Sequence, residues 1–223
     1  MPDKNILTQT DIKKELKIAL LEKREINLSG RVLDFLQFRN ETIDQGINLE
    51  GAIILGSIYL DNIFIKGNLN LNQALVKESF YFSEGSLEGT LNLENTRING
   101  VINLVGTNIA QDLICKNLNL IGFLGLSKTK IKGNVDLTNI KVNDNYSAGL
   151  IIKGDIYLRE ALILGNFIAE NIFLEGSLDL KNAVINGDVI LDLAKIEENL
   201  ILKEAQIQGK ISLENASYKQ IIR

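Results

Sequence analysis

The chain of 223 residues lacks histidine and tryptophan, and it contains only one proline, one cysteine and one methionine. Histidine is the side chain most often used for proton transfer and metal binding near neutral pH. Its absence argues against catalysis, although Asp, Glu, Lys, Tyr or Cys could still do chemistry. A single cysteine, Cys115, excludes an internal disulfide framework and favours a reducing compartment.

An excess of charge of one sign is also missing, because the net charge is only −4 and acidic and basic residues are interspersed. The chain therefore has no basic footprint for nucleic acid. No apolar run reaches the length that crosses a bilayer, and the first 24 residues lack the apolar core of a signal peptide. We expect a cytoplasmic protein without a direct nucleic-acid or membrane partner.

Glycine marks a repeat of eleven residues. Eleven of the 18 glycines share one position of this repeat, in two runs separated by a slip of one residue. Gln45, Glu78, Gln111, Asp144 and Glu198 fill the same position where glycine is missing. The glycines are Gly56, Gly67, Gly89, Gly100, Gly122 and Gly133 in the first run, and Gly154, Gly165, Gly176, Gly187 and Gly209 in the second.

Counted from glycine as position 1, positions 3, 5, 8 and 10 are apolar or small, as in Leu178, Leu180, Ala183 and Ile185. Alternation of apolar and polar residues is the pattern of short strands with one buried face. We expect these four positions to point inward throughout. Position 7 is often Asn, which suits a tight corner with positive φ, and a second corner is expected around the glycine.

One repeat cannot bury its apolar face alone, so the repeats must stack into a solenoid. Two repeats, about 22 residues, close a turn with four short sides, whereas a single repeat is too tight for its inward side chains. Tyr59 and Tyr81 are then one turn apart, as are Ile168 and Ile190. The predicted fold is all-β, a right-handed β-solenoid (β-helix) with an N-terminal capping α-helix.

Ala183-Val184-Ile185 and Ala194-Lys195-Ile196 each pair a small with a large inward residue. This pattern resembles the bacterial pentapeptide-repeat proteins, whose five-residue units form a right-handed quadrilateral β-helix. The repeat here departs from theirs regularly, because every second unit has six residues and a large-x-large inward pair, as in Leu178-Asp179-Leu180. The resemblance covers residues 45–218 and implies the fold; the family's topoisomerase protection by DNA mimicry is implied only weakly.

Residues 8–23 break the repeat, and Thr10 and Asp11 are typical residues of a helix start. A helix here would cap the first turn, as solenoids require; the alternative is a partner-binding helix. We divide the chain into a helical cap with irregular first coils, residues 1–44, and the β-solenoid, residues 45–223. The inner face of the expected helix consists of Ile12, Leu16, Ala19 and Leu20.

Residues 143–149 interrupt the repeat within the rod. Their polar, Asn-rich sequence predicts a bulged loop. Such a loop is either a binding loop on a rigid scaffold or a length irregularity without function.

The C-terminal end has no comparable cap, and Tyr218, Ile221 and Ile222 lie close to its last repeat. An open edge of this kind favours self-association, unless these residues fold over it. We predict a homodimer through this edge. Further candidate interface residues are outward-facing and apolar: Tyr59, Tyr81, Ile168 and Ile190.

We predict no catalytic, cofactor or metal site, and hence no enzyme. Cys115 occupies an inward position, which indicates a buried thiol. The acidic residues scatter over outward positions, and neither Asp179 nor Asp192 has a carboxylate partner in register. The glycine series follows the fold and is not a phosphate-binding loop.

These observations favour a non-catalytic protein-interaction or assembly scaffold that self-associates and has a protein partner. Two alternatives are a cytoskeletal polymer resembling bactofilins and a topoisomerase-protecting DNA mimic. Outward lysines such as Lys66 and Lys203 argue against the second, because they interrupt any acidic stripe. An enzyme on a β-helix scaffold comes last, since fold alone does not decide function.

Overall fold

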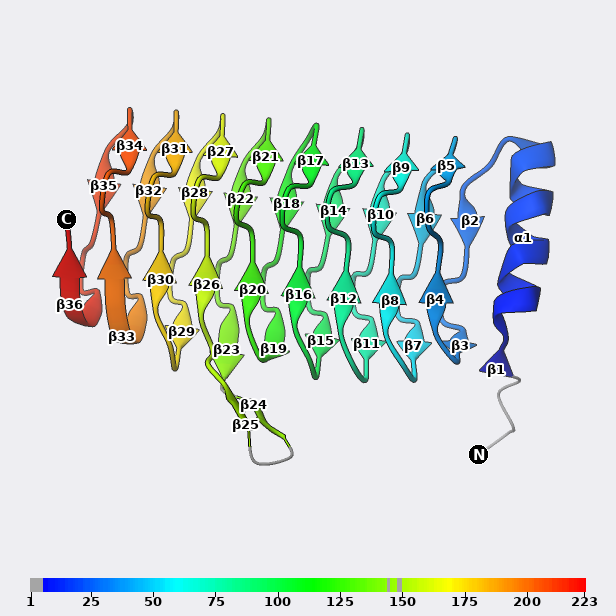
Figure 1. The fold of residues 1–223 in the computed structure, drawn as a ribbon, viewed down its shortest axis with the longest axis horizontal. Helices are drawn as coiled ribbons and strands as arrows, with labels where there is room; N and C mark the ends of the chain where they lie inside the picture. The colour runs from blue at the N-terminus through cyan, green and yellow to red at the C-terminus, as the bar shows by residue number, and fades with distance from the viewer. Residues whose placement is uncertain (1–5, 144, 148–149) are drawn as a thin grey trace.

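The computed structural model describes residues 6–143, 145–147 and 150–223. It is an all-β parallel solenoid of about nine stacked turns, with one helix lying across its N-terminal end (Figure 1). Strand partners in successive turns are 22 residues apart, as in Leu69 and Leu91. The predicted fold class and the length of the turn are confirmed, and the right-handed sense of coiling stays a prediction.

One turn consists of four short strands that stack on four separate ladders of the rod. A strand at positions 3 and 4 of the repeat is followed by a corner and then by a strand at positions 9 and 10. The corner residue at position 7 takes a left-handed conformation, with φ 56° at Asn62 and φ 57° at Asn182. Asn and Gly adopt this conformation with least strain, which explains why Asn recurs there.

The first ladder contains strands at positions 3 and 4 and forms a sheet of nine strands. Ile26, within the segment expected to be irregular, already pairs with Ile47 in this ladder. The regular stack therefore begins N-terminal of residue 45. The strands are β2 (Ile26–Asn27), β6 (Ile47–Asn48), β10 (Leu69–Asn70), β14 (Leu91–Asn92), β18 (Leu113–Ile114), β22 (Val135–Asp136), β28 (Phe167–Ile168), β32 (Val189–Ile190) and β35 (Ile211–Ser212).

The second ladder follows it around the turn and contains strands at positions 9 and 10. Its N-terminal strand pairs Ile6 with Val32, so it covers the edge of the first full turn. The strands are β1 (Ile6–Leu7), β3 (Val32–Leu33), β7 (Ile53–Ile54), β11 (Leu75–Val76), β15 (Arg97–Ile98), β19 (Asn119–Ile121), β23 (Lys141–Asn143), β29 (Phe173–Leu174), β33 (Lys195–Ile201) and β36 (Ser217–Ile222).

The third ladder joins the second at the C-terminal end, because β33 and β36 run through the corner between them. Together the two ladders form one sheet of 17 strands. The remaining strands of the third ladder are β4 (Leu36–Gln37), β8 (Ile58–Tyr59), β12 (Phe80–Tyr81), β16 (Ile102–Asn103), β20 (Leu124–Gly125), β26 (Ile156–Tyr157) and β30 (Leu178–Asp179).

The fourth ladder is a separate sheet of eight strands that completes the turn. It contains strands at positions 9 and 10, and it carries the groove described below. The strands are β5 (Thr42–Ile43), β9 (Phe64–Ile65), β13 (Ser86–Leu87), β17 (Asn108–Ile109), β21 (Lys130–Ile131), β27 (Leu162–Ile163), β31 (Val184–Ile185) and β34 (Gln206–Ile207).

The inward positions form one continuous apolar core along the rod. Leu93, Leu180 and Ile185 are all 0% exposed, as the alternation predicted. Cys115 lies in the same core, and burial raises the pKa of its thiol, which makes it a packing residue. Where position 8 is Thr, the hydroxyl donates to a backbone carbonyl of the preceding turn, as from Thr96 to Leu71 over 2.7 Å.

The recurring glycine is explained by the close approach of stacked backbones. A Cβ atom at Gly89 would lie 2.5 Å from the carbonyl oxygen of Gly67, and one at Gly187 would lie 2.6 Å from that of Gly165. No side chain fits such a gap unless the turns move apart. The neighbouring position 2 adds a polar ladder, because Asn68 accepts from the backbone N–H of Thr90 over 2.9 Å.

A ten-residue insertion interrupts the stack between β23 and β26. Across it, strand partners are 32 residues apart instead of 22, as in Leu124 and Ile156. The bulged loop expected at residues 143–149 is part of a longer antiparallel hairpin of β24 (Asn145–Ser147) and β25 (Leu150–Ile152), which projects from the rod (Figure 1). The apparent slip of one residue is therefore an insertion; Asp144, assigned to the repeat, lies outside the described residues.

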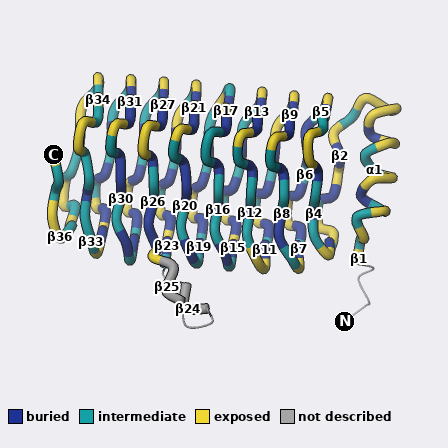
Figure 2. Tube along the Cα trace, viewed as in Figure 1, coloured by how far each residue is buried: buried dark blue, intermediate teal, exposed yellow. Residues whose placement is uncertain are grey.

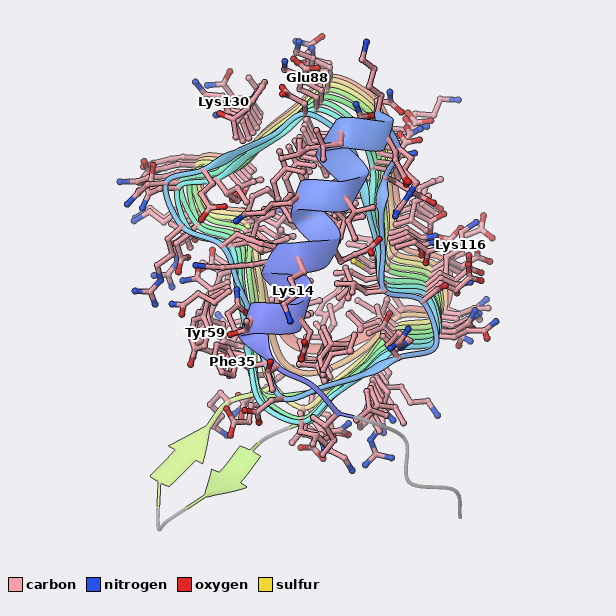
Figure 3. All side chains as sticks on the ribbon, turned by 90° about the vertical axis from the view of Figure 1, so that its right-hand side faces the viewer. Lys14, Phe35, Tyr59, Glu88, Lys116 and Lys130 are labelled. Carbon is pink, nitrogen blue, oxygen red and sulfur yellow. The ribbon has the colours of Figure 1, made fainter. Side chains whose placement is uncertain are left out.

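Helix α1 (Gln9–Glu22) lies across the first turn (Figure 3). Its N-cap is Thr8, two residues before the expected start, and Thr8 and Asp11 form a reciprocal capping box. Ile12 and Ala19 are fully buried against the rod, whereas Leu20, expected on the same face, is 39% exposed. The helix ends at Glu22, and its C-cap residue Lys23 takes a left-handed conformation with φ 54°.

Candidate interaction surfaces

The C-terminal end of the rod exposes part of the core. β34, β35 and β36 are the last strands of their ladders, and within the described chain none has a strand partner on its outer side. Inward-facing residues that are fully buried in the middle of the rod are only partly buried here, and Ile211 is 44% exposed. They surround a hollow of about 500 Å³ at the end face, lined by Leu202, Ala205, Ile207, Ile211, Leu213, Ile221 and Arg223.

The three predicted end residues lie together on β36. Tyr218 pairs with Ile196 and Ile221 with Leu200, so both continue inward columns of the core. Ile222 pairs with Ile201, which places it on the outward column beside them. These residues extend the stack by one further strand and do not fold over the edge. Their role as an interface stays a prediction.

Tyr59 and Tyr81 lie next to each other on the third ladder. Their rings stack with centroids 5.4 Å apart and planes 7° apart, and the Arg39 guanidinium lies 5.5 Å from the Tyr59 ring centre. The stack ends after two rings, because Asn103 follows Tyr81 in the ladder. Both tyrosines are half-buried, so this pair stabilises its own wall of the rod.

Ile168 and Ile190 pair with each other on the first ladder, on a different wall from the two tyrosines. Both are half-buried, with Asp136 on one side and Ser212 on the other. The structure therefore divides the predicted interface residues into three separate groups: the two tyrosines, the two isoleucines and the three residues at the C-terminal end.

A cluster of charged and polar groups lies beside the insertion, and the sequence did not reveal it. Asp179 sits at an outward position yet is 1% exposed, because Arg159 of the preceding turn covers it and pairs with its carboxylate. Tyr157 donates to Asp155 over 2.5 Å, and burial together with this bond raises the pKa of Tyr157 to about 12. The bond with Asp179 likewise raises the pKa of Arg159.

The charged and polar groups of this cluster are paired with one another and with the backbone. The Arg159 guanidinium also lies 5.3 Å from the Tyr157 ring centre, and Asp155 accepts from the backbone N–H of Ser177. A phenol with a raised pKa acts as a hydrogen-bond donor at neutral pH and not as a base. The 22-residue turn alone predicts that Asp179 lies next to Tyr157 on the rod. It does not predict that the Arg159 side chain folds over Asp179 and buries its carboxylate.

Asn side chains form a ladder along another corner of the rod. Asn117 donates to Asn95 over 3.0 Å, Asn139 to Asn117 over 3.1 Å, and Asn171 to Asn139 over 2.8 Å. The amides bond to each other, so this corner is a structural feature. Among the described residues, no group of three or more Cys, Asp or Glu side chains is placed to hold a metal ion.

The fold defines a parallel β-solenoid repeat protein. Comparison with protein-family models, with curated proteins and with solved structures finds no match to the chain. The described part of the chain contains no helix with the length and apolar character that crossing a membrane requires.

Proposed function

We propose that the protein is a non-catalytic assembly module, a rod that self-associates through its C-terminal end. One observation carries the proposal: inward residues such as Ile211, Leu213 and Ile221 remain partly exposed at that end, whereas helix α1 covers the other. Exposed apolar side chains beside unpaired strand edges favour association. A protein partner other than a second copy of the chain would bind the side walls of the rod, which the end contact leaves uncovered.

A two-fold axis perpendicular to the rod suits this end face. The axis reverses the direction in which the second copy circulates, so strands that meet at the junction run antiparallel. Such a contact is isologous and closes after two copies. A bactofilin-like open polymer would need a second open end, and α1 covers the N-terminal one.

The experiment is light scattering across a concentration series, with the double variant Tyr218→Lys and Ile222→Lys. We expect a wild-type dimer and a folded monomeric variant, because two like-charged end faces repel each other and lose their apolar contact. Leu21→Lys is the matched control, since Leu21 is 84% exposed at the opposite end, and it should remain dimeric. A monomeric wild type at high concentration, or a dimeric double variant, would refute the proposal.

We infer a kinship of fold with pentapeptide-repeat proteins, supported by the four ladders and by the small residues at position 8. A topoisomerase-protecting DNA mimic is less well supported, because lysines interrupt the acidic residues along the described walls; Lys66 pairs with Asp44 over 2.6 Å and Lys116 with Asp136 over 3.1 Å. The unpaired, buried Cys115 suits a reducing compartment, so we propose a cytoplasmic location.

A further inference from the structure

The fourth ladder carries a groove that none of the interfaces above uses. It has a volume of about 240 Å³ and crosses five neighbouring strands, β9, β13, β17, β21 and β27. At the usual spacing of strands this gives a length of about 19 Å along the rod. The shape is therefore that of a narrow channel suited to a linear ligand.

Apolar groups line most of this channel. Phe64 stands at one end, Leu162 and Leu164 stand at the other, and Ala110 lies between them. Leu164 is 43% exposed, so a large apolar side chain meets solvent here. Covering these groups would remove apolar surface from water, which is the main source of affinity for an aliphatic ligand.

Two ammonium groups flank the channel near its leucine end. Lys130 and Lys132 lie on either side of the inward-facing Ile131, and both are exposed. Neither forms an ion pair with any residue of the described chain. In Figure 3 the Lys130 and Glu88 side chains both point away from the rod.

Glu88 is the acidic residue of the channel lining, against the two ammonium groups of Lys130 and Lys132. The Lys66 ammonium, whose pKa is raised chiefly by its hydrogen bond to Asp44, is also stabilised by Glu88. The excess positive charge of the channel therefore lies at Lys130 and Lys132, which favours one anionic group there.

We propose that this channel binds a linear aliphatic carboxylate, by chemical class a medium-chain fatty acid. The carboxylate lies between the Lys130 and Lys132 ammonium groups. The chain then runs over Ala110 toward Phe64, a path of about 14 Å across three strand spacings. The aliphatic stems of both lysines pack against it.

The test is calorimetric titration with decanoate, kept below its micelle concentration, and with decanol as the uncharged analogue. We expect saturable binding of one decanoate per chain. The double variant Lys130→Met and Lys132→Met keeps the aliphatic stems and should weaken decanoate binding roughly tenfold or more while leaving decanol unchanged. Lys77→Met, which removes an exposed lysine outside the channel, is the matched control and should bind decanoate as the wild type does.

Ala110→Phe tests the course of the chain, because it fills the middle of the channel from an outward position that the core does not depend on. We expect both ligands to lose binding while the circular dichroism spectrum is unchanged; Asn108→Trp provides a second blocking variant. Absence of saturable decanoate binding would overturn the proposal, as would equal binding by the methionine or blocking variants. Binding of an alternating Leu-Glu peptide but not of decanoate would assign the channel to a protein partner instead.

This site is independent of the end contact. The monomeric end variant Tyr218→Lys with Ile222→Lys should bind decanoate as the wild type does, because the channel lies on a side wall. Absence of decanoate binding would therefore not contradict self-association through the C-terminal end. Absence of self-association would likewise not contradict decanoate binding in the channel.

Discussion

The two ends of the rod differ in how their outermost strands and inward-facing side chains are covered. At the N-terminal end, β1 pairs with β3, and the Gln9 side chain bonds to both the N–H and the C=O of Gln37 on β4. Helix α1 then covers the inward side chains with Ile12 and Ala19. At the C-terminal end β36 only extends the stack by one strand, and within the described residues no further strand pairs with its outer edge; Figure 2 shows by colour how far each residue there is buried.

The difference shows that stacked repeats provide strand partners for one another everywhere except at the two ends of the stack. A strand inside the stack has partners on both sides, and its inward residues are covered by the next turn. A final strand needs something other than another repeat. α1, with its own capping box and with Arg24 bonded to Glu15 and Glu22 over 2.6 Å each, is such an element.

The largest expected effect compares equal positions inside the rod and at its open end. Leu180 and Leu213 both occupy position 5, but Leu180 is fully buried and Leu213 is only partly so. Leu180→Asp should cost several kcal/mol, because it places a charge in the apolar column, whereas Leu213→Asp should cost only about 1 kcal/mol. Chemical denaturation measures both, and equal losses would show that the end is as well covered as the middle.

Opening the covered end should make the two ends alike. Ile12→Asp puts a charge between α1 and the first turn, and we expect the helix to detach at a cost of about 3 kcal/mol. Faster hydrogen exchange in β2, β3 and β4 would report the exposed turn. If the C-terminal ends also pair, light scattering should then show chains longer than dimers; Lys17→Asp, on the exposed side of α1, is the control.

The smallest effect concerns the capping box of α1. Thr8→Ala removes the side-chain acceptor of the Asp11 N–H and should destabilise the docked helix by about 1 kcal/mol, and Thr8→Ser should restore it. Hydrogen exchange of the α1 amides measures the change. No difference between Thr8→Ala and wild type would mean that packing alone holds the helix.

The capping box also has a defined pH dependence. The hydrogen bonds from Thr8 lower the pKa of Asp11 from its usual 3.8. A lowered pKa in the folded state means that the contribution is complete above pH 3.8 and is lost as the pH falls through the lowered value. The difference between wild type and Thr8→Ala should therefore narrow in acid.

The sequence predicted the inward columns well, because a period of two within a period of eleven leaves one way to bury the apolar residues. Ile58, Leu60, Ile63 and Ile65 all follow that rule. It predicted less well wherever a neighbouring turn intervenes. Asp179 is buried by Arg159, a residue 20 positions earlier that no local pattern links to it. The insertion was mistaken for a one-residue slip, because ten residues in a frame of eleven leave nearly the same phase.

What the sequence by itself determined is thus the repeat, its buried face and the need for a cap, since each follows from local spacing and from the solvation of apolar side chains. Tertiary structure alone decided how the outward residues are grouped on the walls. It kept the Tyr59–Tyr81 pair apart from Ile168 and Ile190, it laid Arg159 over Asp179, and it placed Lys130 beside a channel. The physical reason is that an outward side chain has no core to fix its direction, so its contacts depend on the turns above and below it.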